Sequence, residues 1–355
     1  MSLMEKMKKT TTSKYANQLS KSEVFNRTEE IITDVPVLNV AMRGSLGGGM
    51  TAGILGICGE SRHFKTNFAL KIAAAFMRQN KDGVILFIDS EFGSPQSYFE
   101  TYGIDTNRVF HVPVTNLEEM TFELTQQIDQ FSRDDKVLIL IDSLGNIASK
   151  REQDNALEGK GTADMSRAAK IKSLFRLITS SVRLKNIPLI FINHIYKEQT
   201  GTAYAKNIVS GGQGPMLAAN DLWIITRAQD KDSDGDLNGY KFTINIEKSR
   251  FVKEKTKIPV TVSFDNGINL YSGILDLAID GKFVMKPSNG WYQLVDETTG
   301  EMVGTKVRAA DTETKEFLGK VIANKKFQQF VKDKYQLIAP KLDEDSSAEE
   351  VMSSV

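Results

Sequence analysis

Nine consecutive residues have the composition and setting of a phosphate-binding loop. They follow an apolar run, they open a stretch with helical spacing, and they are Gly59, Glu60, Ser61, Arg62, His63, Phe64, Lys65, Thr66 and Asn67. Where a strand passes into a helix, backbone N–H groups converge on a phosphate, a lysine reaches its β and γ oxygens, and a hydroxyl helps to hold Mg²⁺. Lys65 and Thr66 suit the last two roles. Phe64 stands where the usual pattern has a second glycine, so an ordinary strand-to-helix turn is the alternative.

Two further apolar runs end in acidic residues. Residues 137–141 lead into Asp142, and residues 84–88 lead into a turn that contains Glu91. Because the carboxyl ends of strands in an α/β sheet face the ligand crevice, we expect Asp142 beside the Mg²⁺ of the loop and Glu91 where it can orient the attacking water. Either acid alone also fits a buried strand with a capping residue. Three strand ends that meet in one crevice favour a site of nucleotide hydrolysis.

The elements that must position these residues alternate between strands and helices. Apolar runs predict strands at 53–58, 84–88, 109–112, 137–141 and 188–192, and helical spacing or composition predicts helices at 65–79, 95–102, 117–132 and 165–184. Repeated β-α winding is typical of a mostly parallel sheet flanked by helices. After Asn220, runs at 222–227, 241–246 and 260–264 predict antiparallel strands added to that sheet. The fold class expected is therefore α/β.

The chain divides into four expected regions. They are an amino-terminal helix and linker at 1–35, an ATPase-like α/β core at 36–271, a small carboxy-terminal subdomain at 272–340, and a disordered acidic tail at 341–355. Within the first part, residues 13–26 have the composition of a short helix. Residues 31–40 are apolar, and we expect an extended linker there, since Pro36 argues against a central strand.

Composition narrows the class of protein without deciding its ligand. Hydrophobic residues make up 41% of the chain and charged residues 25%, as in globular proteins, and 45 basic residues balance 45 acidic ones. Local basic clusters exist at 248–257 and 160–176, although each alone also fits a solvated face. No apolar run approaches the roughly 18 residues of a membrane span, and no secretory signal is visible, so we expect a soluble intracellular protein. Cys58, the single cysteine, suits a buried structural thiol.

Taken together, the motifs resemble those of the RecA family of recombinases, and in particular the UvsX recombination proteins of T-even-like bacteriophages. The segments that carry the resemblance are 59–67, 88–93, 110–114, 141–149, 173–176, 192–194 and 247–250. The resemblance runs from about residue 10 to residue 292. The UvsX proteins also have a residue other than glycine at the position of Phe64, so this departure from the usual pattern is a trait of the family that the sequence resembles.

The resemblance implies a DNA-dependent ATPase that uses ATP and Mg²⁺ and releases ADP, or further AMP. Proteins of this family bind ATP between the protomers of a helical filament on DNA. Glu91 corresponds to the glutamate that activates water, and Tyr98 to the aromatic residue that stacks on adenine. Lys248 and Arg250 correspond to two basic residues that reach the γ-phosphate from the neighbouring protomer. His194 corresponds to a γ-phosphate sensor, a glutamine in RecA, although a lone histidine also fits a structural role.

Two segments match the DNA-binding loops of the family. The first covers residues 149–165 and the second residues 196–215, and the candidate contacts are Lys150, Arg151, Lys160, Lys197, Lys206, Gly211 and Gly212. Contacts of this kind to the DNA backbone give salt-dependent binding with little sequence preference. The amino-terminal helix matches a segment that packs on the next protomer, or it covers the chain's own core. The acidic tail either restrains duplex binding or serves only as a solubilising end.

The function implied is homologous pairing and strand exchange between a single-stranded DNA filament and a homologous duplex, in recombination, repair and recombination-dependent replication. A single-strand DNA-binding protein and a mediator are the expected partners, and the expected location is the host cytoplasm if the chain is phage-encoded. A hexameric replicative helicase of the same superfamily is the first alternative, and Glu91 with the Lys248-Ser249-Arg250 element argues against it. A non-hydrolysing DNA-binding filament is the second, and intact Lys65, Thr66 and Asp142 argue against that.

Overall fold

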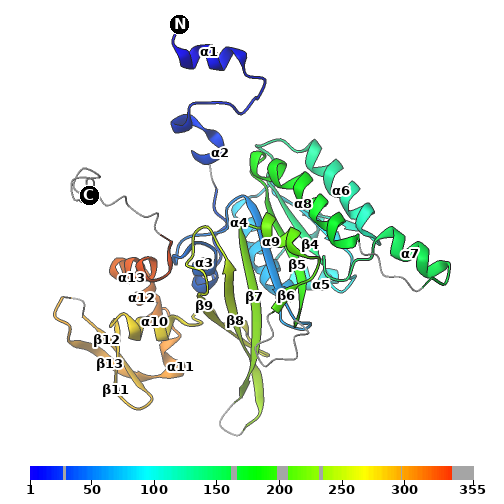
Figure 1. Ribbon diagram of the computed structural model, residues 1–355. Helices are drawn as coiled ribbons and strands as arrows, with labels where there is room; N and C mark the ends of the chain where they lie inside the picture. Colours follow the sequence, from blue (N-terminus) through cyan, green and yellow to red (C-terminus); the bar gives the residue numbers. More distant parts are fainter. Residues whose placement is uncertain (27–28, 161–165, 198–206, 232–234, 297, 338–355) are drawn as a thin grey trace, which may run out of the picture.

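The computed structural model describes residues 1–26, 29–160, 166–197, 207–231, 235–296 and 298–337. The tail expected at 341–355 and the candidate contact Lys206 lie outside these residues. The main sheet has ten strands in the order β10-β9-β8-β7-β1-β5-β4-β2-β3, with β6 paired to β5. Its centre is parallel and its β7 to β10 side is antiparallel (Figure 1). The predicted α/β class with added antiparallel strands is confirmed.

The predicted β-α alternation is confirmed element by element. The parallel strands are β1 Gly53–Gly59, β2 Val84–Asp89, β3 Val109–Pro113, β4 Val137–Asp142 and β5 Pro188–Lys197, which runs further than predicted. The helices between them are α4 Lys65–Gln79, α5 Gln96–Thr101, α6 Leu117–Gln130 and α8 Arg167–Leu184. The antiparallel side comprises β7 Asp221–Lys231, β8 Leu237–Lys248, β9 Lys257–Ser263 and β10 Gly267–Ile268. Two short elements lie between β5 and β7 in the chain, β6 Asn207–Val209 and α9 Gln213–Ala218.

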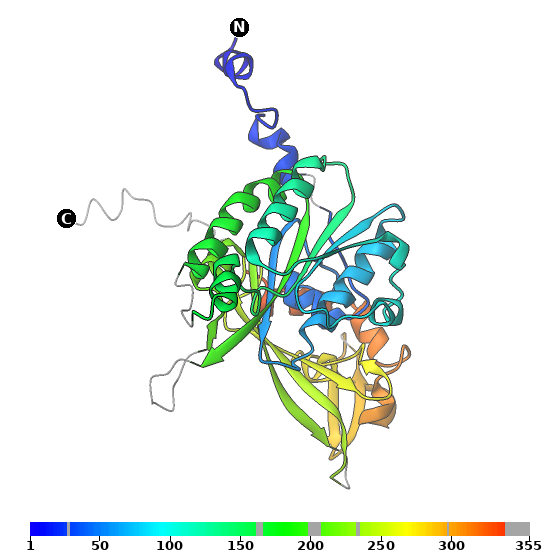
Figure 2. The same cartoon turned by 90° about the vertical axis from the view of Figure 1, so that its right-hand side faces the viewer.

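Apolar runs form the central strands because these strands are covered on both faces. Every residue of β1 and β4 is buried, as parallel strands between two helical layers must be. Helix α4 lies over one face of the sheet, and α6 and α8 lie over the other (Figure 2). Cys58 in β1 is fully buried, and burial raises its thiol pKa to about 12. The prediction of a structural thiol is confirmed, and none of the described helices is both long and apolar enough to cross a membrane.

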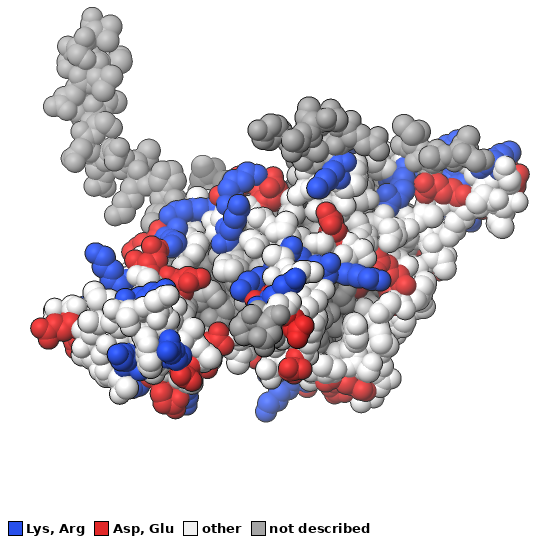
Figure 3. All heavy atoms as spheres, turned by 90° about the horizontal axis from the view of Figure 1, so that it is seen from below, with Lys and Arg blue, Asp and Glu red and all other residues white. Residues whose placement is uncertain are grey.

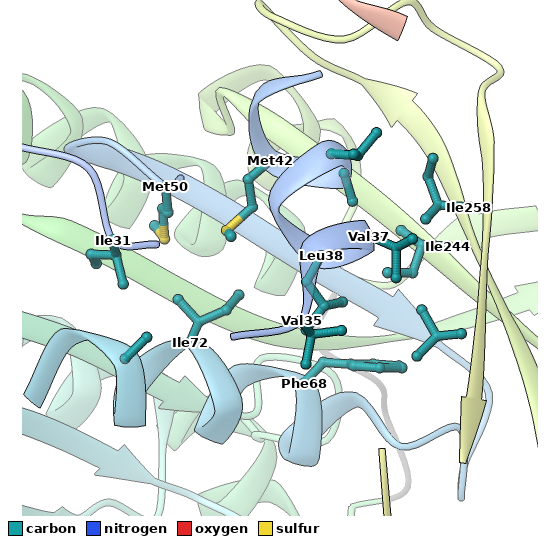
Figure 4. Packing of buried hydrophobic residues seen from close by; sticks show 14 of the residues in the cluster. Ile31, Val35, Val37, Leu38, Met42, Met50, Phe68, Ile72, Ile244 and Ile258 are labelled. Carbon is teal, nitrogen blue, oxygen red and sulfur yellow. The ribbon is translucent and has the colours of Figure 1, made fainter. Parts of the chain in front are cut away.

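Helix α3 replaces the second half of the extended linker predicted at residues 31–40, and only residues 31–35 precede the helix without helical structure. It spans Pro36–Arg43 and ends at Gly44, whose φ of 70° closes the helix in the left-handed region. Proline disfavours a strand, but its fixed φ suits the first turn of a helix. The apolar residues then fall on one helical face, packed between α4 and the strands β8 and β9 (Figure 4). The residues of this contact include Val37, Leu38, Met42, Phe68, Ile72, Ile244 and Ile258.

The single helix predicted at residues 13–26 is also wrong. The amino-terminal helix is α1, Leu3–Thr10, which begins with a reciprocal capping box between Ser2 and Glu5. Within residues 13–26 the structure has only a 3-10 turn at Leu19–Lys21 and the short helix α2, Glu23–Asn26. Helix α1 buries none of its residues and stands away from the body of the protein in both views (Figures 1 and 2).

The carboxy-terminal segment builds a small antiparallel sheet against helices. Its elements are α10 Ile274–Asp280, β11 Val284–Ser288, β12 Trp291–Val295, β13 Met302–Arg308, α11 Ala309–Thr312, α12 Leu318–Ala323 and α13 Lys325–Tyr335. Buried residues of this segment, such as Phe327, join the apolar cluster of the main sheet. After α13 the chain pairs with residues beyond β8, where the Leu337 N–H donates to the Phe251 carbonyl at 2.7 Å. The division predicted at residue 272 stays a prediction.

Candidate functional site

A pocket of about 710 Å³ lies where the central strands end. Its polar lining includes Lys65, Thr66, Glu91, Asp142 and His194, which lie in or after four different strands. Its aromatic lining includes Tyr98, Tyr102, Tyr240 and Phe264. The structure thus brings the residues predicted from strand ends into one crevice, together with the predicted Tyr98.

The phosphate loop turns twice through the left-handed region. Arg62 and Phe64 both have φ of 60°, and Phe64 is the cap residue before α4. This conformation costs a residue other than glycine roughly 1–2 kcal/mol. The ring of Phe64 stacks on Phe242 at 5.3 Å between centroids and meets Phe68 edge-on at 5.5 Å. These aromatic contacts offset the backbone cost, which is why a side chain can replace the usual glycine.

Lys65 and Thr66 begin α4 with their polar groups held toward the crevice. The Lys65 ammonium donates to the Glu60 carbonyl at 2.7 Å and is 7% exposed. Burial lowers the pKa of Lys65, while the nearby Glu91 and Asp142 oppose that shift. The Thr66 hydroxyl donates to Oδ2 of Asp142 at 2.8 Å. Within the part of the chain that the structure describes, the Glu60 carbonyl is the only hydrogen-bond partner of this ammonium, so a phosphate can replace it.

The residues present fit a magnesium ion. Asp142 is 3% exposed, and burial raises its pKa to about 6. Its Oδ1 atom is buried and has no hydrogen-bond partner among the described residues, which leaves one carboxylate oxygen open to a ligand. Mg²⁺ takes oxygen ligands, often one or two carboxylates together with phosphates. Asp142 and the hydroxyl of Thr66 are therefore the groups that would hold it.

Glu91 is the centre of a hydrogen-bonded network. Its Oε1 atom accepts from the Ser143 hydroxyl at 2.5 Å and from the Asn146 amide at 3.3 Å, and Nε2 of His194 lies 2.9 Å away. The hydrogen bond from His194 lowers the pKa of Glu91 to about 2, against the effect of burial. Glu91 is thus an ionised acceptor. A Cβ atom at Gly145 would lie 2.4 Å from Cδ2 of His194, so only glycine allows this packing.

Several residues of the site were not singled out from the sequence. Ser143 and Asn146 hydrogen-bond to Glu91; they follow Asp142 by one and four residues, and that nearness was the available signal. Phe264 follows β9 and is 62% exposed, and it lines the same pocket as Tyr98, which is 46% exposed. Arg227 stacks over Tyr240 at 4.4 Å and donates to the Arg62 carbonyl at 3.1 Å. These last residues come from the antiparallel strands, and no local motif marks them.

The remaining residues of the loop have structural partners. His63 is buried, and its Nδ1 atom lies 3.1 Å from the Ser61 carbonyl oxygen. Asn67 forms a side-chain hydrogen bond with Tyr102. Gly59 ends β1, where a Cβ atom would lie 3.0 Å from the Ile225 carbonyl oxygen. Residues 61–67 of the predicted loop line the pocket, whereas Gly59 and Glu60 do not.

Lys248 and Arg250 do not line this pocket. In register, Lys248 pairs with Leu222, which pairs with Gly56 in the middle of β1 and not with Gly59 at the loop. The Lys248 ammonium donates to the carbonyls of Met216 and Leu217 at the end of α9, at 2.9 and 3.1 Å. Burial lowers the pKa of Lys248, and Arg250 adds to that shift. A role for these cations at a γ-phosphate therefore requires a second copy of the chain.

The first predicted DNA loop contains a helix. Lys150 and Arg151 open α7, Lys150–Leu157, which Ser149 caps in a second capping box with Glu152. The expectation of a loop over residues 149–165 is therefore wrong for this part, because the capping residues nucleate a helical turn. Lys160 is exposed and pairs with Glu158.

In the second predicted loop, Lys197 is exposed at the end of β5. Gly211 and Gly212 have φ of 85° and 76°, and a Cβ atom on Gly211 would lie 2.8 Å from Cδ1 of Ile171 in α8. Their glycine character is thus explained by local packing, and contact with DNA stays a prediction. On the face of the molecule seen from below, Lys and Arg side chains lie beside Asp and Glu side chains (Figure 3). No single sign of charge dominates that view.

A phosphate loop at the carboxyl edge of a mostly parallel sheet defines the class of P-loop nucleotide-binding proteins. The model of the RecA N-terminal domain family matches residues 4–269. A second family model, that of the C-terminal domain of the bacteriophage T4 recombination and repair protein, matches residues 271–331. The chain belongs to the RecA family.

Individual relatives agree with both family models. The Recombination and repair protein of Enterobacteria phage T4 is 44% identical over 339 residues, which is 94% of this chain and 86% of that protein. Protein RecA of Cytophaga hutchinsonii is 26% identical over 300 residues, covering 82% of this chain and 81% of that protein. Protein RecA of Aquifex pyrophilus is 25% identical over 279 residues, or 77% of each chain. The resemblance drawn from the sequence motifs is confirmed.

Proposed function

We propose that this chain is an ATP-dependent DNA recombinase. It forms a helical filament on single-stranded DNA and exchanges strands with a homologous duplex, in recombination, repair and recombination-dependent replication. The observation that carries the proposal is the convergence of Lys65, Thr66, Glu91 and Asp142 in one crevice. The names of the relatives, a recombination and repair protein and several RecA proteins, support it.

In the proposed reaction, ATP lies along the crevice. Adenine stacks between the exposed rings of Tyr98 and Phe264, which line the same pocket. The triphosphate lies on the N–H groups that open α4, where the helix dipole favours negative charge. Lys65 leaves the Glu60 carbonyl to bind the terminal phosphates.

Glu91 orients the attacking water and accepts its proton. Its carboxylate is ionised, and Ser143 and Asn146 hold it in place. A bound Mg²⁺ would supply charge neutralisation on the phosphates, held by Thr66 and Asp142. Hydrolysis then needs a group to stabilise the charge on the γ-phosphate, and this chain's own pocket offers Lys65 and His194 for it.

The further cations come from the neighbouring protomer. Lys248 and Arg250 lie away from the pocket of their own chain, and we assign them to the γ-phosphate of an adjacent copy, as an arginine finger acts in trans. Lys248 must then exchange its two carbonyl partners at the end of α9 for phosphate oxygens. Hydrolysis thereby depends on assembly.

His194 provides a route from nucleotide to DNA. It lies in β5, contacts Glu91 through Nε2, and precedes the second predicted DNA loop in the chain. A γ-phosphate that competes for the imidazole proton would release Glu91 and shift the end of β5. The predicted DNA contacts Lys150, Arg151 and Lys197 are exposed, as backbone-directed binding requires.

Further parts of the proposal concern assembly and partners. The exposed amino-terminal helix α1 would pack on the next protomer, and the four regions with boundaries at 35, 271 and 340 would act as units. A single-strand DNA-binding protein and a mediator would help loading, in the host cytoplasm. AMP is a possible second product, and the tail at 341–355 restrains duplex binding or only solubilises the chain.

ATP hydrolysis with and without single-stranded DNA tests the proposal, together with strand exchange against a homologous and a non-homologous duplex. Stimulated hydrolysis with exchange that requires homology is the expected result. Stimulated hydrolysis with unwinding that ignores homology would identify a helicase instead. DNA binding without any hydrolysis would identify a structural filament.

A further inference from the structure

Asp89 and His111 form a pair beside the candidate catalytic glutamate and outside the pocket. Asp89 is the last residue of β2, and its side chain is 5% exposed. His111 lies in β3, the edge strand of the sheet, and its side chain is 49% exposed. Nε2 of His111 lies 3.2 Å from Oδ2 of Asp89. The proposed function gives this pair no role, although His111 belongs to one of the motifs that carry the family resemblance.

The other oxygen of Asp89 holds the turn that carries Glu91. Oδ1 accepts the backbone N–H of Glu91 at 3.1 Å and that of Phe92 at 2.8 Å. Phe92 has φ of 54°, in the left-handed region that residues other than glycine rarely adopt. A turn in this conformation needs hydrogen bonds to keep it, and Asp89 supplies two of them. The position of the Glu91 side chain therefore depends on the orientation of the Asp89 carboxylate.

His111 fixes that orientation from the edge of the sheet. Nε2 of His111 contacts Oδ2, the oxygen of Asp89 that does not accept from the turn. The imidazole stacks on Phe87, its register partner in β2, at 5.3 Å between centroids and 24° between planes. In the same sheet Asp89 pairs in register with Asp142, so a donor on the far side of Asp89 also offsets repulsion between two carboxylates.

We propose that Asp89 and His111 are positioning residues for hydrolysis. His111 orients the carboxylate of Asp89, and Asp89 holds the turn that places Glu91 against the attacking water. The inference rests on the proposed function. Neither residue lines the pocket, and the groups that would bind phosphate and adenine lie on α4, on α5 and after β9. Loss of the pair should therefore slow turnover and leave ATP binding intact.

Two substitutions of different length test this in the full chain, with ATPase activity measured on single-stranded DNA. Asparagine at position 111 is too short to reach Asp89, whereas the amide of glutamine extends about as far as Nε2 of histidine. His111→Asn should lower kcat about tenfold with an unchanged KM for ATP, since small shifts of a catalytic group are costly. His111→Gln should recover most of the loss. Phe110→Ala, on the opposite face of the same strand and 55% exposed, should leave kcat unchanged.

A double substitution separates positioning from general damage. Asp89→Asn should lower kcat alone, and the addition of His111→Asn should lower it little further, because both residues act through one contact. A wild-type kcat for His111→Asn, a rise in KM at constant kcat, or glutamine no better than asparagine would each overturn the pair's role. If the unsubstituted chain hydrolyses no ATP on DNA, the proposed function fails as well. Full activity in both the wild type and His111→Asn removes the inference alone.

Discussion

The buried carboxylate of Asp142 makes the nucleotide-free protein sensitive to pH. Burial raises its pKa from 3.8 to about 6. Between these values the folded state binds more protons than the unfolded chain, so this residue's contribution to stability falls as the pH rises through the window. Asp142→Asn removes the charge and keeps an acceptor for the Thr66 hydroxyl. We expect the nucleotide-free variant to unfold several degrees above wild type at pH 8, with a smaller difference at pH 5, in calorimetric scans.

The same variant provides its own control through magnesium. Hydrolysis dependent on Mg²⁺ should be lost in Asp142→Asn, because the amide is a poor substitute for a carboxylate ligand. Stabilisation by ATP with Mg²⁺ over ATP alone, measured as a shift in Tm, should disappear with it. An unchanged Tm at pH 8 would contradict the burial argument, and an unchanged magnesium effect would contradict the assignment of the ligand.

Phe64 tests how a side chain replaces glycine in the phosphate loop. Phe64→Gly relieves the left-handed backbone cost but loses the contacts with Phe68 and Phe242. Phe64→Ala loses the same contacts and keeps the backbone cost. We therefore expect the free energy of unfolding to fall in the order wild type, glycine, alanine, with about 1 kcal/mol between the last two. Urea denaturation of the nucleotide-free chain measures it, and alanine more stable than glycine would contradict the explanation.

At the residue scale, sequence reasoning reached the groups that local patterns mark. Lys65 and Thr66 follow from a strand-to-helix junction, and Asp142 and Glu91 follow from apolar runs that end in acids. Phe264 could not be found in this way, because its place in the same pocket as Tyr98 depends on how the antiparallel strands join the parallel ones. The pair of Asp89 and His111 likewise depends on the register of β2 with β3.

At the scale of elements, helix α3 packs in the core, whereas helix α1 is exposed to solvent. Leu38 in α3 is fully buried, while Leu3 in α1 is 74% exposed. Leu38→Ala should lower the free energy of unfolding by about 2–4 kcal/mol, as for other buried leucines. Leu3→Ala, the matched control, should change it by less than about 0.5 kcal/mol in the dilute monomer. Chemical denaturation compares the two, and equal effects would mean that α1 folds back onto its own chain.

Helices and strands were predicted correctly where the apolar pattern of the segment matches the way in which the rest of the fold covers it. The strands at 137–142 and 84–89 are continuous apolar runs because both faces are covered, and α4 has the length and spacing of a helix. Helix α3 was missed because eight apolar-rich residues that begin with a proline fit an extended segment equally well. Its helical state is decided by packing against α4, β8 and β9, which are distant in the sequence.

At the scale of the whole molecule, the nucleotide pocket and the cations assigned to it lie on different surfaces. Lys248 is the last residue of β8, on the antiparallel side, and Arg250 follows it. The pocket lies at the carboxyl ends of the parallel strands, and neither cation lines it. A head-to-tail interface joins two different surfaces of one chain and propagates into a filament. The family resemblance already implied that these cations act on a neighbouring protomer, and the register of β7 with β8 gives the physical reason.

Mixing two inactive variants tests whether catalysis is shared between protomers. Glu91→Gln removes the base from one pocket, and Lys248→Ala with Arg250→Ala removes the cations from the other surface. Each variant alone should lose DNA-stimulated hydrolysis while remaining folded and able to bind ATP. In an equal mixture, about a quarter of random head-to-tail interfaces join an intact pocket to intact cations, so hydrolysis should reappear at about that fraction of the wild-type rate. Because a site contained within one chain cannot be restored by mixing, a mixture as inactive as its components would return Lys248 and Arg250 to a structural role.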